Sequence, residues 1–170
     1  KKKERIVVPI SAIGGYDESA GRWQRLFMPG GQQYLIKGRG VPTIWDLNTP
    51  SASPMSVERL HQPIFERLGL TWEVFSMNFL NYPQRKYLEV GSVMGRYCDK
   101  VELTDLDGQR AIVWLDIEFG APLQAQIFDK NATLRRTMRV VSLQKADSQW
   151  ILRRYETVDA VTKVKITIEV

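Results

Sequence analysis

From about residue 85 to its C-terminus, the chain alternates apolar and polar residues in one short segment after another, with polar turns between them. The last segment, residues 164–170, shows this most clearly, because its four apolar side chains alternate with Lys165, Thr167 and Glu169. A period of two places the apolar side chains on one face of a β-strand and the polar ones on the other. The second half therefore predicts an antiparallel meander with one dry face, which needs an apolar partner to cover it.

Strands joined by short turns are predicted along most of the chain. Residues 105–108 and 129–131 are rich in Asp, Asn and Gly, the residues that hairpin turns favour. The predicted strands are residues 5–10, 22–28, 33–37, 43–47, 86–90, 95–104, 110–118, 122–129, 134–144, 149–157 and 162–170. A sheet of about ten or eleven strands normally curls or closes. The predicted fold class is therefore mainly β (α+β), a curled, incompletely closed antiparallel β-barrel or half-barrel.

The hydrophobic period changes near the middle of the chain. From Ser56, a candidate N-cap, to Gly69, a candidate C′ residue, apolar residues recur at spacings of three and four. This predicts a helix that is kinked or restarted at Pro63. A second helical segment is predicted over residues 71–80, although strand-like alternation fits those residues nearly as well. Residues 56–80 are expected to form one or two helices that act as a lid.

Composition and charge restrict the class of protein. With 170 residues, 44% of them hydrophobic and 25% charged, the chain is expected to form a single domain over residues 1–170. The net charge of +5 indicates mild basicity, which either aids solubility or marks a surface that meets an acidic partner. Cys98 is the one cysteine, so neither an intramolecular disulfide nor a thiolate metal site is expected. No apolar run approaches the roughly 20 residues that cross a bilayer.

Catalytic residues are hard to find in this sequence. His61, the single histidine, lies in the predicted helix and is expected to have a surface or capping role. Asp116 and Glu118 lie two apart on one predicted strand, so they form either a carboxylate pair for acid and base chemistry or part of a solvated face. Cys98 is expected to be a small core residue. We therefore predict no catalytic residue, no cofactor and no metal ligand.

Arginines on two neighbouring predicted strands raise the possibility of nucleic-acid binding. Cations stand beside aromatic residues there, as in sheets that bind single strands, and the residues concerned are Arg135, Arg136, Arg139, Arg153, Arg154 and Tyr155. Acidic residues interleave with these arginines, however, and no recognition motif is present. We therefore expect no nucleic-acid partner.

Large aromatic residues are more numerous than a thin sheet usually needs. They either pack a solid core or line a partly empty pocket for an acyl chain, as in barrels with open mouths. The candidate cavity residues on the predicted lid are Trp72, Phe75 and Phe79. Those on the predicted sheet are Trp23, Val113, Leu115, Ile117 and Ile127.

An ordered series of short motifs over residues 85–170 resembles the outer-membrane lipoprotein-sorting family, the LolA-like and LolB-like proteins. The series consists of Gly-Arg-Tyr-Cys at 95–98, Val-Trp-Leu-Asp at 113–116, Ala-Pro-Leu at 121–123, Ile-Phe-Asp at 127–129, Trp150 and the closing strand at 162–170. In that family, the N-terminal half supplies strands followed by helices that plug an incomplete barrel. Residues 56–80 are compatible with those helices.

The resemblance implies a non-enzymatic protein of the bacterial envelope that binds and carries lipid or lipoprotein acyl chains. It implies a periplasmic location, membrane-bound release and acceptor proteins as further partners, and a monomer. Because the chain begins with Lys rather than Met, we expect that a signal segment has been removed from its N-terminus. No lipid-anchoring cysteine stands near that end, so a soluble carrier is expected rather than an anchored receptor. The alternatives are an envelope interaction or sensor module without lipid cargo, and a hydrolase that uses Asp116 and Glu118.

Overall fold

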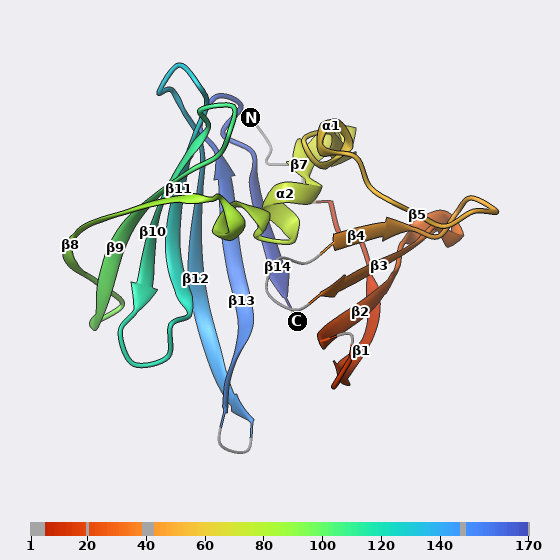
Figure 1. Cartoon of the computed structure of the whole chain (residues 1–170), viewed down its shortest axis with the longest axis horizontal. Coiled ribbons are helices and arrows are strands. Elements are labelled where there is room, and N and C mark those ends of the chain that lie inside the picture. The colour runs from red at the N-terminus through yellow and green to blue at the C-terminus, as the bar shows by residue number, and fades with distance from the viewer. Residues whose placement is uncertain (1–5, 20, 39–42, 147–148, 170) are drawn as a thin grey trace. The chain divides into compact units, whose positions relative to one another are not determined.

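A computed structural model describes residues 6–19, 21–38, 43–146 and 149–169 of the chain (Figure 1). Strands make up 58% of the chain and helices 12%, which confirms a mainly β protein. The sheets are antiparallel, and none closes on itself within the described residues. By its internal contacts the chain divides into two compact units, Lys1–Gln62 and Pro63–Val170. The expectation of a single domain stays a prediction.

The first unit contains a five-stranded sheet whose strands follow the chain order. The elements are β1 (Ser11–Asp17), β2 (Gly21–Phe27), the 3-10 turn η1 (Pro29–Gly31), β3 (Gln33–Gly38), β4 (Thr43–Asp46) and β5 (Ser53–Pro54). The strand predicted at residues 5–10 is wrong for residues 6–10, which have no regular structure. Pairing begins instead at Ser11. Pro9 accounts for the difference, because proline has no N–H to donate to a strand ladder.

One face of this first sheet is covered at one end. Leu26, Tyr34 and Ile44 share that face and are 1%, 5% and 3% exposed. The short helix α1 (Val57–Leu60) is held at the same face by an ion pair of 2.9 Å between Nη2 of Arg59 and Oδ2 of Asp46. The core of the first unit therefore lies on the α1 side of the sheet.

The middle of the chain departs from the long helix predicted over residues 56–69. Ser56 is the N-cap of α1 as predicted, but the helix ends at His61, its C-cap. The chain then forms β6 (Pro63–Phe65), the 3-10 turn η2 (Glu66–Leu68) and β7 (Leu70–Thr71), with β6 and β7 paired. Pro63 cannot continue the helical hydrogen bonds, and Gly69 takes a left-handed conformation at φ 61°.

The helix predicted over residues 71–80 is present in a shorter, broken form. It consists of α2 (Trp72–Phe75) and the 3-10 helix η3 (Asn78–Asn81), and residues 72–81 are called the helical segment below. Thr71 caps α2, because its hydroxyl accepts a 3.3 Å hydrogen bond from the N–H of Val74. Met77 separates the two helices in a left-handed conformation at φ 54°, which interrupts the helical hydrogen bonding.

The seven strands predicted beyond residue 84 are all present and form one seven-stranded sheet, in the order β14-β13-β12-β11-β10-β9-β8. Each strand pairs with its neighbours in the chain, which confirms the meander (Figure 1). The strands are β8 (Gln84–Val93), β9 (Arg96–Thr104), β10 (Arg110–Asp116), β11 (Pro122–Phe128), β12 (Leu134–Ala146), β13 (Gln149–Asp159) and β14 (Lys165–Glu169). The described residues form 14 strands, more than the predicted ten or eleven. The excess arises because β5, β6 and β7 are strands of only two or three residues each.

The helical segment packs against one face of the seven-stranded sheet. Val74 and Phe79 of this segment, 4% and 0% exposed, belong to one apolar cluster with Val113 and Met138 of the sheet, which are both 0% exposed. Fully burying one such side chain stabilises a fold by about 1.5–3 kcal/mol. This cluster is the core of the second unit.

Polar bonds also fasten residues 69–82 to one another and to the sheet. Nη2 of Arg136, on β12, donates to the carbonyl of Gly69 at 2.8 Å and to Oδ2 of Asp159 at 3.1 Å. The Tyr155 hydroxyl donates to the carbonyl of Phe75 at 3.2 Å. The Tyr82 hydroxyl donates to Oε1 of Glu73, and its burial together with the charge of Glu73 raises the pKa of Tyr82. In the part of the chain that the structure describes, no helix has the length and apolar character to span a bilayer.

Candidate functional site

An apolar cavity of about 300 Å³ lies in the second unit. Its walls come from the turn between α2 and η3, the end of β10 with the loop after it, the start of β11, and a cross-strand pair on β12 and β13. The lining residues are Ser76, Met77, Leu80, Asp116, Phe119, Ala121, Pro122, Leu123, Leu143 and Leu152. Most are apolar, and such a surface suits an apolar ligand.

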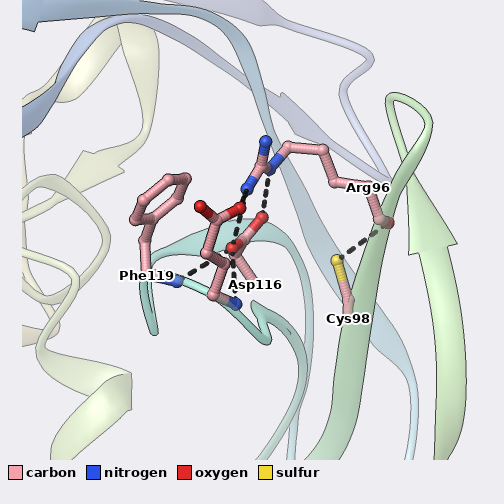
Figure 2. Close-up of polar contacts among 5 residues, drawn as sticks. Arg96, Cys98, Asp116 and Phe119 are labelled. Carbon is pink, nitrogen blue, oxygen red and sulfur yellow. Dashed lines mark hydrogen bonds and ion pairs between the residues drawn. The ribbon is translucent and has the colours of Figure 1, made fainter.

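The two polar residues of the cavity wall already have partners. The Ser76 hydroxyl donates to the carbonyl of Trp72 at 2.7 Å, so it offers no free donor to a ligand. Asp116 is 2% exposed and is bound by Arg96, a residue outside the cavity lining (Figure 2). The cavity therefore presents hydrocarbon to a ligand, with few polar groups left to satisfy.

Arg96 connects the two carboxylates at the end of β10 and just beyond it. Its Nε contacts Oδ2 of Asp116, and its Nη2 lies 3.1 Å from Oδ1 of the same residue. The same Nη2 also donates to Oε2 of Glu118 at 2.9 Å. The guanidinium stands 4.7 Å from the centroid of the Phe119 ring, a cation–π distance. Arg96 therefore holds the loop that forms one wall of the cavity (Figure 2).

These bonds keep Asp116 ionised. Hydrogen bonding from Arg96 is the main cause that lowers the pKa of Asp116, and the backbone N–H groups of Glu118 and Phe119 add to it against the opposing effect of burial. Those two N–H groups lie 3.0 and 2.9 Å from Oδ1. A carboxylate with these partners is poorly suited to deliver a proton at neutral pH. The geometry gives Asp116 and Glu118 one shared arginine, which favours a structural role for the pair.

Strand register explains why these residues meet. Asp116 pairs with Cys98 across β10 and β9, and Arg96 lies two residues before Cys98 on the same side of the strand. The N–H of Gly120 bonds to the carbonyl of Asp116 at 2.7 Å, and φ of 66° at Gly120 suits glycine. Leu115 of β10 pairs with Pro122 of β11 and skips Leu123, so the register between the two strands shifts there by one residue. This irregularity forms where the cavity lies.

Cys98 is buried, at 0% exposure, and its thiol lies 3.5 Å from the carbonyl of Arg96 (Figure 2). Burial raises the pKa of this thiol, which keeps it protonated and poorly nucleophilic. The interpretation of Cys98 as a small core residue is confirmed.

Solved structures of other proteins share the fold of this chain. A domain named as a putative outer membrane lipoprotein-sorting protein, from Vibrio parahaemolyticus, superimposes with a TM-score of 0.71 at 18% sequence identity, over 94% of this chain and 73% of that one. A LolA superfamily protein from Nitrosomonas europaea gives a TM-score of 0.61 at 19% identity, over 94% and 80% of the two chains. The protein has a LolA-like fold. A DUF1329 family protein from Desulfovibrio piger gives a TM-score of 0.70 at 17% identity, over 94% and 74%.

At these identities the similarity establishes the LolA-like fold and nothing finer. No protein-family model matches the sequence, and no curated protein matches it. The resemblance inferred from the motifs of the second half is confirmed at the level of fold.

Within the LolA-like fold, the predicted cavity residues of the second unit fall into three groups, and none of them lines the observed cavity. Ile117 is 54% exposed on the loop after β10. Phe75 and Leu115 are half-buried and pack against the core cluster. The fully packed residues are Trp72, Phe79, Val113 and Ile127, which are 3%, 0%, 0% and 5% exposed. Their role in ligand binding stays a prediction.

Trp23, the remaining predicted cavity residue, lies on β2 of the first unit and is half-buried. Its indole ring lies against Gly15 of the neighbouring strand. Its predicted role in a cavity also stays a prediction.

The predicted cavity residues and the lining of the observed cavity come in part from the same segments, but from different positions on them. The lid residues predicted to bind a ligand were Trp72, Phe75 and Phe79, whereas the cavity is lined by Ser76, Met77 and Leu80 of the same segment. The break at Met77 rotates the residues after it, and no helical period predicts such a rotation. One signal was available: the Pro-Leu dipeptide at 122–123, part of the motif series, lies in the cavity wall.

The turn at residues 105–108 is a hairpin turn, as predicted. The N–H groups of Asp107 and Gln109 bond to Oδ1 of Asp105 at 2.9 and 2.7 Å. Gly108 has φ of 84°, a value that glycine tolerates best. Across the described stretches, no group of three or more His, Cys, Asp or Glu side chains could hold a metal ion.

Proposed function

We propose that this protein binds lipid or lipoprotein acyl chains non-covalently in the apolar cavity of its second unit. The observation that carries the proposal is the cavity itself, about 300 Å³ of space walled mainly by hydrocarbon and bordered by a charged cluster on one side. Ligand pockets begin at about this volume. The role we assign is a non-enzymatic carrier.

The cavity volume limits the cargo that fits without rearrangement. At ~30 Å³ for a water-sized group, the space holds about ten methylenes of one chain. Their transfer from water at ~0.8 kcal/mol each gives ~8 kcal/mol, an upper bound near micromolar affinity. Ordering and association costs reduce that value. We therefore expect one acyl chain at micromolar or weaker affinity in this conformation.

Larger cargo requires the helical segment to act as a lid. Phe79 and Val74 lie between this segment and the sheet, so its withdrawal would uncover Val113 and Ile127. Such a motion would bring Val113 and Ile127, two of the predicted ligand-binding residues, into a larger cavity. Lids of this kind move on microsecond to millisecond timescales.

The LolA-like fold supports the class of cargo and the setting. One similar structure is named for outer membrane lipoprotein sorting and another for the LolA superfamily. We infer a periplasmic or envelope location, a monomer, and membrane-bound release and acceptor proteins as partners.

A fluorescent fatty acid titrated into the purified protein tests the cavity. We expect saturable binding, and Leu152→Trp should weaken it at least tenfold by filling the cavity. The control is Leu106→Trp, which adds the same side chain at a position that is 87% exposed on the turn between β9 and β10. If Leu152→Trp does not fold, Leu80→Trp fills the same space from the opposite wall. Equal binding by the filled and control variants would refute the proposal.

A second candidate function is an interaction module with the same fold and no cargo. The complete burial of Phe79 and Val113, both 0% exposed, favours it, because this part of the interior is solid. Native mass spectrometry of protein purified from an envelope fraction separates the two. Bound lipid or acylated peptide supports the carrier, whereas ligand-free protein that retains a co-purifying partner supports the module.

A further inference from the structure

Two aromatic–cation pairs lie on one face of the five-stranded sheet in the first unit. Strand register places Trp23 opposite Lys37, Arg25 opposite Leu35, and Leu35 opposite Trp45. Directly paired residues share a face, so these side chains stand together. With Phe27 and Ile13, they form what we call the aromatic–cationic face. The core of this unit, with α1, lies on the opposite face.

Each cation on this face stands over an aromatic ring. Nζ of Lys37 lies 4.6 Å from the centroid of the Trp45 ring, and the Arg25 guanidinium lies 5.4 Å from that of Phe27. The Trp23 ring lies across Gly15 of β1, where an added Cβ would be 3.4 Å from the indole nitrogen. The absence of a side chain at Gly15 therefore lets the ring spread over the neighbouring strand.

Neither cation of this face forms an ion pair with a described carboxylate. Among the described residues, no carboxylate lies within ion-pair distance of Arg25 or Lys37, and the side-chain acceptor of Arg25 is the neutral amide of Gln33 at 3.1 Å. The one acidic residue that shares this face on β1 is Asp17, at the end of the strand. Arg25 is exposed and Ile13 is 55% exposed, so water reaches this face. The face thus offers positive charge beside apolar surface.

We propose that the aromatic–cationic face binds an anionic phospholipid surface. Tryptophan and the long stems of Lys and Arg partition to the boundary between lipid headgroups and hydrocarbon, where the charged ends reach phosphates. Ile13 and Leu35 add aliphatic contact between the rings. This inference does not rest on the cavity, which belongs to the second unit.

A single-stranded nucleic acid fits the same face less well. Bases bind such sheets by stacking on the free faces of aromatic rings. On Phe27 and Trp45, Arg25 and Lys37 already occupy a ring face. Binding to a bilayer needs only cationic charges near the lipid headgroups, so the two cation–aromatic pairs remain intact when the face binds a bilayer.

Co-sedimentation with phosphatidylcholine vesicles, with and without about one third phosphatidylglycerol, tests the proposal. We expect binding only with the anionic lipid, and weaker binding at higher salt. Arg25→Gln and Lys37→Gln should each weaken binding about fivefold. The matched control is Arg22→Gln, because Arg22 is exposed on the same strand and lies on the opposite face. It should change binding less than twofold.

Three outcomes would overturn the proposal. Equal binding to neutral and anionic vesicles would show that charge plays no part. Equal losses of vesicle binding in the Arg22 and Arg25 variants would show only a general attraction between a basic protein and anionic lipid. Displacement of the vesicles by a thymidine oligonucleotide that depends on Arg25 would assign the face to nucleic acid. The cavity-filling Leu152→Trp variant should bind vesicles normally, so the failure of one proposal is distinguishable from that of the other.

Discussion

Truncation of Phe79 tests whether the helical segment is a packed part of the second unit. Phe79 is 0% exposed and lies in the apolar cluster between this segment and the sheet. Replacing a buried Phe with Ala removes its transfer free energy and leaves a cavity, which together cost about 3–5 kcal/mol. Since domains of this size are stable by about 5–15 kcal/mol, Phe79→Ala should remove a large part of the free energy of unfolding.

Phe119→Ala is the matched control. This ring is 42% exposed, and it makes a cation–π contact with Arg96 at 4.7 Å, so its loss should cost about 1 kcal/mol or less. Urea denaturation followed by far-UV circular dichroism measures the stability of both variants. An unchanged slope of the free energy of unfolding against urea concentration would indicate that only stability differs. If the Phe79 variant loses no more stability than the Phe119 variant, the helical segment spends much of its time away from the sheet. The burial of Phe79 would then contribute little to the free energy of unfolding, contrary to what its packing implies.

Three further predictions concern polar groups of the second unit. The folded-state pKa of Asp116 is lowered from 3.8, so the stabilisation that this carboxylate provides is complete above the unfolded-state pKa and disappears as pH falls through the folded-state pKa. The difference in free energy of unfolding between wild type and Asp116→Asn should therefore shrink below about pH 4, and urea denaturation at several pH values measures it. Arg136→Met should destabilise the protein by about 3 kcal/mol, because Asp159 loses its cationic partner and keeps only its bonds from the N–H groups of Val161 and Thr162. Arg136→Lys should not restore the loss, since one ammonium cannot reproduce the guanidinium contacts, and thermal unfolding of both variants checks this. Cys98 should react with a thiol reagent only at the rate of unfolding, and fast reaction of the native protein would contradict its burial.

The fold of the second half could be predicted because alternation is a local signal that the structure uses directly. The alternation over residues 110–118 predicts a strand, and β10 occupies Arg110–Asp116 with Ala111 and Val113 fully buried on one face. The error over residues 56–69 has a physical reason. Ile64 and Phe65 fit a helical spacing, but Pro63 ends the helix, and the pairing of β6 with β7 then uses the same residues.

The cavity could not be predicted, because its walls depend on where separate elements meet. The alternation of Val113, Leu115 and Ile117 predicts one shared face, yet Val113 is fully buried and Ile117 is 54% exposed. The strand ends at Asp116 and the loop turns away, so the alternation stops carrying information there. The bond between Arg96 and Asp116 joins residues 20 positions apart, and no local pattern indicates it.

The chain-order arrangement of β8 to β14 has a consequence for how the polypeptide reaches its folded state. Every pairing in this sheet joins consecutive segments, so each hairpin can form as soon as its second arm leaves the ribosome, without waiting for distant sequence. β14 occupies an edge, so none of the pairings among β8 to β13 involves it. The sheet can therefore assemble by adding one strand after another, without pairing segments that are distant in the sequence.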